Sequence, residues 1–386
     1  MSYRKVRVIA FYLPQYHPIP ENNEWWGKGF TEWTNVAKAK PLFRGHYQPK
    51  IPRDLGFYDL RLPDIKEEQA KLAREAGIEG FAYWHYWFGN GKRLLERPFN
   101  EVLNSGKPDF PFCLAWANHS WSNKTWKKEF SKKQGKVVIQ EQLYPGIQDY
   151  TDHFYSVLDA FRDSRYITVD GKPLFFIFDP KFKDISVFIE TWRDLAIKNG
   201  LKGIHFVGQY FKQREKKYKS YSSKTSTTDT TNSELAPYFS KGLDAINLHG
   251  NIKAEFIRKG YFRKMVNYVL TNFTPLHVYD IYDQQKINDR IFGKEDSLDN
   301  VYPTILPNWD RTARFGNQAA IYINSTPEVF KEHIEDALRL VKHKTSQHKI
   351  IFLKSWNEWG EGNYVEPCLK YGKGYLNALR DTLKQE

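Results

Sequence analysis

Two glutamates, Glu358 and Glu361, stand three residues apart in the segment 356–361. Cleavage of a glycosidic bond needs two protonatable groups beside it, one to protonate the leaving oxygen and one to assist at the sugar carbon. Gly360 lets the backbone turn between the two glutamates, so that both side chains can face one cavity. If both are buried, their repulsion drives the two pKa values apart, which leaves one as a base and the other as a proton donor. The alternative is that one of them only pairs with a lysine or arginine at the rim of the fold.

Aromatic, histidine, amide and acidic side chains also follow most of the apolar runs of the sequence. The rings supply flat apolar area for stacking on sugars, and the polar groups supply the directional hydrogen bonds that select hydroxyl patterns. One such residue alone is more often a packing residue, and an aspartate such as Asp179 or Asp310 can equally be a structural cap, but their concentration indicates a substrate site. The candidate substrate-binding residues are Tyr12, Gln15, His17, Trp26, Glu32, Trp33, His85, Trp87, Trp116, Asn118, Trp121, Asp179, His249, Trp309, Asp310, Trp356, Asn357, Trp359 and Glu366.

The elements that must position these residues alternate along the chain. Short apolar runs predict eight strands, and the amphipathic segments between them predict seven helices, the alternation expected of a parallel sheet with crossover helices. The predicted strands are 6–11, 80–86, 111–116, 174–178, 205–210, 245–249, 301–306 and 350–354. The predicted helices are 63–76, 94–104, 147–162, 185–199, 254–270, 327–342 and 371–384.

This pattern predicts an α/β fold with one (β/α)8 barrel and long βα loops. A doubly wound dinucleotide-binding sheet is disfavoured, because no GxGxxG turn follows the first strand. The 386 residues suit a single barrel domain, 1–386, with a Lys-, Ser- and Thr-rich loop insertion at about 211–241. In such a barrel the active site forms at the carboxyl ends of the strands, where the candidate residues lie.

The composition limits the kinds of partner that the protein can bind. A net charge of +13 suggests nucleic acid or an anionic membrane surface as a partner. However, the basic residues are scattered, and no nucleic-acid-reading motif accompanies them. With 12 Trp, 24 Tyr and 27 Phe, the chain has rings beyond the needs of a core, so we expect an oligosaccharide or polysaccharide partner, and an anionic polysaccharide would use the same charge. The sequence does not indicate an oligomeric state.

A metal or other cofactor is not expected. His85, His119 and His249 match no metal-ligand spacing, and the two cysteines, Cys113 and Cys368, form no CxxC pattern. The apolar run at 6–11 is too short for a signal peptide or a membrane span, so the sequence predicts a cytoplasmic protein.

Several motifs resemble those of a known family. The segments 11–17, 25–26, 30–36 and 356–362 are similar to those of the WbsX-type family, whose members are often labelled glycosyltransferases of polysaccharide biosynthesis and are related to glycoside hydrolase family 99. The likeness covers nearly the whole chain and implies a (β/α)8 barrel that acts on glycosidic bonds.

Family 99 contains retaining endo-α-mannosidases with a Glu-Trp-His-Glu segment, which aligns with residues 358–361. The resemblance implies that Glu358 is the base that withdraws the proton of the neighbouring 2-hydroxyl, so that this oxygen displaces the leaving group through an anhydro-sugar. It implies that Glu361 is the general acid and then the base. The sequence departs from that segment at Gly360, where family 99 has His, which puts the mannoside specificity in doubt.

Three functions compete. The leading prediction is retaining hydrolysis of an α-linked glycan of the mannose or rhamnose type in a bacterial polysaccharide, by Glu358 and Glu361. The alternative is a glycosyltransferase of cell-surface polysaccharide biosynthesis, although the sequence shows no DxD-type metal motif or nucleotide-binding pattern for an activated donor. A glycan-binding barrel without catalysis would keep the aromatic residues but would not require both glutamates.

Overall fold

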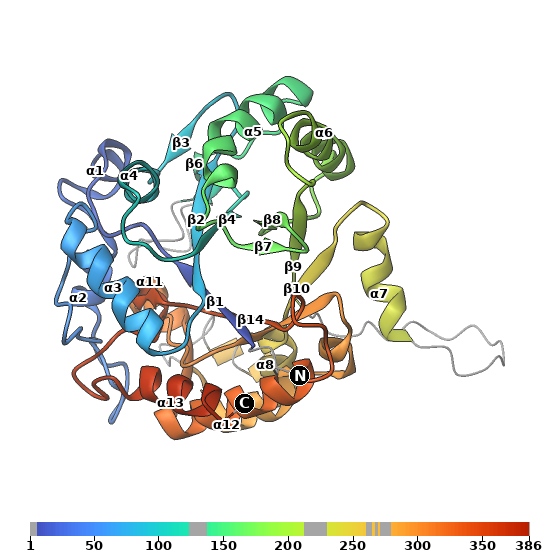
Figure 1. Cartoon of the computed structure of the whole chain (residues 1–386). Coiled ribbons are helices and arrows are strands. Elements are labelled where there is room, and N and C mark those ends of the chain that lie inside the picture. The colour runs from blue at the N-terminus through green and yellow to red at the C-terminus, as the bar shows by residue number, and fades with distance from the viewer. Residues whose placement is uncertain are drawn as a thin grey trace.

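The computed structural model describes residues 6–122, 137–211, 230–259, 265–266, 269–270 and 279–385. In this part of the chain eight parallel strands close into a barrel in the order β1-β2-β4-β8-β9-β10-β12-β14, with β14 paired back to β1 (Figure 1). The predicted (β/α)8 barrel is therefore confirmed. The strands are β1 (Arg7–Tyr12), β2 (Gly80–Trp87), β4 (Phe112–Trp116), β8 (Lys172–Ile177), β9 (His205–Phe211), β10 (Ala245–His249), β12 (Val301–Ile305) and β14 (Ile350–Leu353).

Apolar runs form these strands because a parallel barrel strand is covered on both faces. Every residue of β2, β4, β10, β12 and β14 is buried. All eight predicted strands are present. Strand β8 begins two residues earlier than predicted, at Lys172, because Lys172 and Pro173 pair in antiparallel fashion with the short strand β7 (Thr168–Val169).

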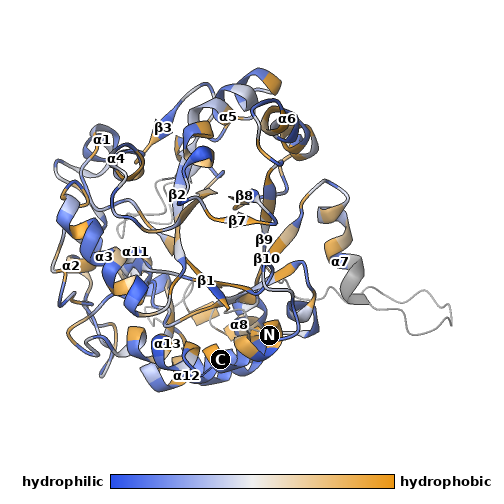
Figure 2. Ribbon diagram, viewed as in Figure 1, coloured by the Kyte–Doolittle hydropathy of each residue, from blue (hydrophilic) through white to orange (hydrophobic). Residues whose placement is uncertain are grey.

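Amphipathic helices surround the barrel, and Figure 2 shows hydrophilic and hydrophobic residues alternating along α12 and α13. In α12 the buried residues Phe330, Ile334, Ala337 and Val341 recur at helical spacing, and the Thr326 side chain caps the helix by accepting from the Val329 N–H. The helices are α3 (Pro63–Glu75), α4 (Arg97–Ser105), α5 (Ile147–Arg162), α6 (Ile185–Lys198), α8 (Asn251–Lys259), α12 (Pro327–Val341) and α13 (Gly374–Leu383).

Three predicted helices begin at other residues than expected. The helix predicted at 371–384 begins at Gly374, as α13. The helix predicted at 94–104 begins only at Arg97, because Leu94 belongs to the short strand β3 (Arg93–Leu94), which pairs with the end of β2. The helix predicted at 254–270 begins earlier, at Asn251, as α8, and most of its predicted second half lies outside the described residues.

The segments between the barrel elements carry further short elements. The described part of the insertion predicted at 211–241 holds the helix α7, and residues 212–229 lie outside the described residues. The division of the chain into one domain stays a prediction. No helix in the described ranges is long and apolar enough to cross a membrane. The short elements are α1 (Pro20–Trp26), α2 (Glu32–Lys38), β5 (Trp121–Ser122), β6 (Val138–Gln140), α7 (Thr230–Phe239), β11 (Asp280–Asp283), α10 (Gln284–Ile291), η2 (Lys294–Ser297), α11 (Thr312–Phe315), η3 (Gly316–Gln318), β13 (Ala320–Ile323), β15 (Asn357–Glu358), η4 (Trp359–Glu361) and β16 (Asn363–Tyr364).

Candidate active site

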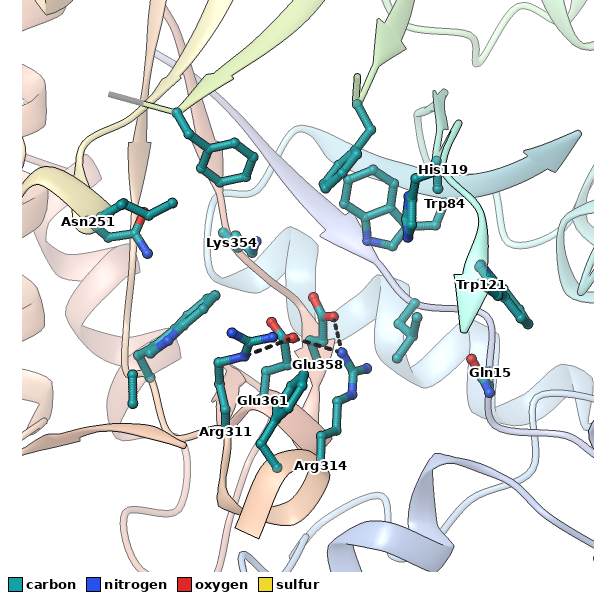
Figure 3. A pocket seen from close by; sticks show the side chains of 18 of the residues that line it. Gln15, Trp84, His119, Trp121, Asn251, Arg311, Arg314, Lys354, Glu358 and Glu361 are labelled. Carbon is teal, nitrogen blue, oxygen red and sulfur yellow. Dashed lines mark hydrogen bonds and ion pairs between the residues drawn. The ribbon is translucent and has the colours of Figure 1, made fainter. Parts of the chain in front are cut away.

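A cavity of about 440 Å³ opens at the carboxyl ends of the barrel strands (Figure 3). Its lining comes from the ends of most strands and from the loops that follow them, as expected for a barrel of this kind. Five of the residues predicted from the sequence line it: Gln15, Trp121, Trp309, Glu358 and Glu361. The sequence prediction missed other lining residues, among them Trp84, Tyr86, His119, Arg311, Arg314 and Lys354.

The two glutamates face the same cavity and share one arginine. Glu358 ends β15 and Glu361 ends η4, and both are buried. Nη1 of Arg314, on α11, lies 3.0 Å from Oε1 of each glutamate. Because both oxygens contact one nitrogen, they lie within about 6 Å of each other, close enough to act on the same bond of a ligand. Each glutamate therefore pairs with an arginine and also lines the shared cavity, so the two expectations from the sequence do not exclude each other.

A third carboxylate lies behind the pair. Arg314 Nε contacts Oε1 of Glu32 at 3.0 Å, and Glu32 is fully buried in α2. A Cβ atom at Gly360 would stand 1.5 Å from the same Oε1. Glu32 thus occupies the space that a side chain at position 360 would need, which accounts for a glycine between the two glutamates.

The charges around the pair give the two glutamates different pKa values. Burial raises the pKa of Glu358, and the negative charge of Glu361 raises it further, against the opposing effect of Arg314. Burial would raise the pKa of Glu361 too, but Arg311 and Arg314 outweigh burial and hold that pKa below its ordinary value. The difference follows from the contacts, because Arg311 Nε lies 3.3 Å from Glu361 Oε1. The site therefore favours a proton on Glu358 and an ionised Glu361.

Asp310 anchors the loop that carries both arginines. Its Oδ2 accepts hydrogen bonds from Gln48 at 2.7 Å and lies 2.9 Å from His46 Nε2, and its backbone N–H donates to the Glu361 carbonyl at 2.8 Å. Burial opposes ionisation of this carboxyl, but Lys50 and His46 outweigh burial and hold its pKa well below the usual range. Asp310 is therefore an ionised support beneath the site, outside the cavity lining.

A buried network around Glu366 fixes the other side of the 356–362 segment. Glu366 accepts hydrogen bonds from Trp359 at 2.6 Å, from Gln69 at 2.7 Å and from Tyr58 at 3.0 Å. Gln69 also accepts from the Tyr12 hydroxyl at 2.7 Å. Several predicted residues thus hold the 356–362 segment in place from behind.

Strand β2 shows why some predicted residues face away from the cavity. Successive side chains of a strand point to opposite faces. Trp84 and Tyr86 line the cavity, whereas His85 and Trp87 pack against His153 of α5. Burial lowers the pKa of His85 and His153 well below the ordinary range, so both are neutral near pH 7.

The other predicted residues outside the cavity lining pack or hydrogen bond within the barrel wall and loops. Asn118 joins two loops, donating to the Asp179 carbonyl at 2.8 Å and accepting from the Asp179 N–H at 2.7 Å. Asn357 joins the end of β14 to the end of β1, donating to the Leu13 carbonyl at 3.0 Å. Substrate contact by the residues outside the lining stays a prediction: Tyr12, His17, Trp26, Glu32, Trp33, His85, Trp87, Trp116, Asn118, Asp179, His249, Asp310, Trp356, Asn357, Trp359 and Glu366.

The missed lining residues carried a partial signal. Trp84 and Tyr86 belong to the same apolar run as His85. Because side chains alternate along a strand, knowing which face one residue occupies is enough to put Trp84 and Tyr86 on one face and His85 on the other. Arg311 and Arg314 lie just beyond Asp310, but no sequence pattern distinguishes them from surface arginines. Within the described residues no group of three or more His, Cys, Asp or Glu side chains is arranged to hold a metal ion.

Comparisons with known proteins agree with this fold and place the chain in a family. A family model described as "Glycosyltransferase WbsX" matches residues 8–379. Two solved structures of glycoside hydrolase family 99 endo-α-mannosidase from Bacteroides thetaiotaomicron, one in complex with bis-tris propane, cover 98% of this chain with a TM-score of 0.54 and 15% identity. The two matches cover 96% and 97% of the solved chains, respectively. A "glycoside hydrolase-like protein" matches with a TM-score of 0.60 and 14% identity, over 98% of this chain and 94% of that one.

A curated relative has a less informative name. The "uncharacterized protein WxcX" of Xanthomonas campestris pv. campestris, strain B100, is 32% identical over 382 residues, covering 97% of this chain and 49% of that protein. The chain spans about half the length of the curated relatives it matches. The chain belongs to the WbsX family.

We expect Gly360→Ala to destabilise the protein, because the added methyl group must displace Glu32 from Arg314. Overpacking of this kind costs about 1–3 kcal/mol in the free energy of unfolding, which chemical denaturation measures. In a Glu32→Ala background the same change should cost much less, since the colliding carboxylate is gone. An equal cost in both backgrounds would show that Glu32 does not set the requirement for glycine.

Burial raises the pKa of Glu32 to about 7, from an ordinary value of 4.5. The folded state therefore binds this proton more tightly than the unfolded state, and stability is lost as the pH rises from about 4.5 to about 7. Glu32→Gln removes this titration, so its free energy of unfolding relative to the wild type should rise by up to about 3 kcal/mol across that window. Denaturation at a series of pH values tests this, and a difference that does not change with pH would contradict it.

Proposed function

We propose that this protein is a retaining glycoside hydrolase that cleaves α-linked glycans of the mannose or rhamnose type in a bacterial polysaccharide. The observation that carries the proposal is the pair Glu358 and Glu361, buried, facing one cavity and held by Arg314 at 3.0 Å from each. Glycoside cleavage needs one group that donates a proton and one that accepts it, and these two carboxyl groups have opposite pKa shifts.

The surroundings of the pair suit a sugar. Trp84, Trp121 and Trp309 supply flat apolar surface for stacking on sugar rings. The buried Nε2 of Gln15 lines the same cavity without a hydrogen-bond partner among the described residues, so it is ready to donate to a sugar hydroxyl. Stacking rings with a few directional polar groups are typical of carbohydrate sites.

The pKa shifts of the two glutamates support Glu358 as the proton donor and Glu361 as the base. These roles are the reverse of those that the family 99 resemblance implies, in which Glu358 is the base. In our proposal Glu358 protonates the glycosidic oxygen while the Glu361 carboxylate takes the proton of the 2-hydroxyl. The 2-oxygen displaces the leaving group and forms a 1,2-anhydro-sugar. Water then adds to the anomeric carbon and returns a proton to Glu358, and the 2-oxygen recovers its proton from Glu361. Both glutamates end as they began, and two displacements give overall retention.

A glycosyltransferase is the second candidate, and the description of the matching family favours it. It would use the same two glutamates, with the hydroxyl of an acceptor glycan in place of water. The relatives are about twice as long as this chain, so the complete proteins also have room for a further activity.

Substitution of the two glutamates tests the proposal. We expect the protein to release sugar from an α-mannosyl or α-rhamnosyl glycan without any nucleotide sugar, and Glu358→Gln and Glu361→Gln each to lower the rate by about 10²–10⁴-fold. The matched control is Glu101→Gln, on α4. Glu101 is also a carboxylate held by two cations, Lys66 of α3 and Arg97 of α4, but it lies outside the cavity lining. Turnover only with an activated donor would support the transferase, and glycan binding without turnover would contradict both candidates.

A further inference from the structure

One buried cation in the cavity makes no direct ion pair within the described residues. Lys354 directly follows β14, is 8% exposed and lines the cavity beside the carboxylate pair. Among the described residues its Nζ makes no hydrogen bond or ion pair, and it lies 5.0 Å from the centroid of the Trp309 ring. Its charge reaches Glu358 and Glu361 only at longer range, where it lowers the pKa of both. A buried ammonium group without a direct partner is suited to hold an anionic group of a ligand.

The nearby carboxylates already have other partners. Glu358 and Glu361 are held by Arg314, and Glu361 also contacts Arg311. On the far side, Glu255 accepts a hydrogen bond from the Tyr322 hydroxyl at 2.6 Å. None of the three carboxylates lies within ion-pair distance of Lys354 in the described structure. Lys354 Nζ therefore has no direct anionic partner among these carboxylates and can contact an anionic group of a bound ligand.

A second cation lies on the same side of the cavity. The Arg311 guanidinium lies 5.9 Å from the Trp309 ring centroid and 4.0 Å from that of Phe315, and its side chain is 35% exposed. Lys354 and Arg311 thus flank one indole ring, and Figure 3 shows both beside the carboxylate pair. Two cations around one aromatic ring provide charge for an anion and apolar surface for the ring that carries it.

The remaining polar group indicates a sugar and not a bare ion. Asn251, at the start of α8, lines the cavity on the side of Lys354 (Figure 3), and its buried Oδ1 has no hydrogen-bond partner in the described structure. An amide oxygen accepts from a hydroxyl but does not bind an anion. A ligand that satisfies both groups carries a hydroxyl and a negative charge.

We propose that Lys354, Arg311, Asn251 and Trp309 form a subsite for a sugar that carries a negative charge, with Lys354 Nζ as the main contact of the anion. The inference rests on the proposed function, since it names the substrate class of that site. The shared chemistry is an anionic group on a sugar. Its source is either the carboxylate of a uronic acid in the glycan or the phosphate of a glycosyl phosphate.

Direct binding tests this subsite without catalysis. Isothermal titration of the full chain compares methyl α-D-glucuronide, α-D-glucose 1-phosphate and the uncharged methyl α-D-glucoside. We expect at least one charged sugar to bind about tenfold more tightly than the glucoside, and the better of the two identifies the source of the anion. Equal binding of the three sugars, or no binding of either charged one, would overturn the proposal.

Substitutions connect the preference to Lys354. Lys354→Met keeps the length of the side chain and removes the charge, so it should abolish the preference for charged sugars, and Lys354→Gln should do the same. The matched control is Lys370→Met, because Lys370 also lies over an aromatic ring, that of Tyr47 at 5.1 Å, but is exposed and outside the cavity. A preference that survives in both folded Lys354 variants would refute the assignment. The sugar-binding measurement tests the subsite, and turnover by Glu358→Gln tests the hydrolase proposal. A Glu358→Gln variant that loses turnover but still binds the charged sugar would show that the two proposals can be tested independently.

Discussion

One guanidinium, that of Arg314, holds three buried carboxyl groups, and the structure of the site depends on it. It contacts Glu32, Glu358 and Glu361 at 3.0 Å each. Because three buried carboxyl groups share this one guanidinium, burial opposes their ionisation and favours a proton on those that have no other close cation. The raised pKa values of Glu32 and Glu358 express this shortage of positive charge, and Arg311 decides that Glu361 is the ionised partner. The same imbalance favours one protonated and one ionised carboxyl group, the combination that the proposed bond cleavage requires.

The barrel supplies the rigidity that this arrangement needs. The arginine loop is fixed by the hydrogen bonds of Asp310, and the glutamate segment by those of Glu366, so both sides of the ion-pair cluster are held from behind. Gly360 belongs to the same design, because only a residue without a side chain leaves room for Glu32. Buried polar residues outside the cavity therefore act on the chemistry by positioning, as supporting groups around a reactive site commonly do.

Periodicity predicted the fold well, because apolar runs that alternate with amphipathic segments indicate a parallel sheet covered on both faces. The number of runs and the missing GxGxxG turn then favoured the barrel over a doubly wound sheet. The sequence predicted the site less completely. Glu358 and Glu361, predicted from their residue type and their spacing across Gly360, do line the cavity. Arg314 was missed, since its importance arises only when the barrel brings α11 against α2 and η4. For β2, composition alone did not separate the inward Trp84 from the outward His85, whereas the register of the strand does so directly.

The Arg314 cluster separates the pKa values of Glu358 and Glu361, so that Glu358 keeps its proton above the ordinary pKa of a glutamate while Glu361 is ionised. Carbon-detected NMR titration of the glutamate side-chain carboxyl groups, assigned with Glu358→Gln and Glu361→Gln, reads the two sites separately. The account predicts that Glu361 is ionised well below pH 4.5 and that Glu358 keeps its proton above that pH. It also predicts that Arg314→Met raises the pKa of the pair. Ordinary pKa values for both glutamates, or the opposite order of ionisation, would contradict it.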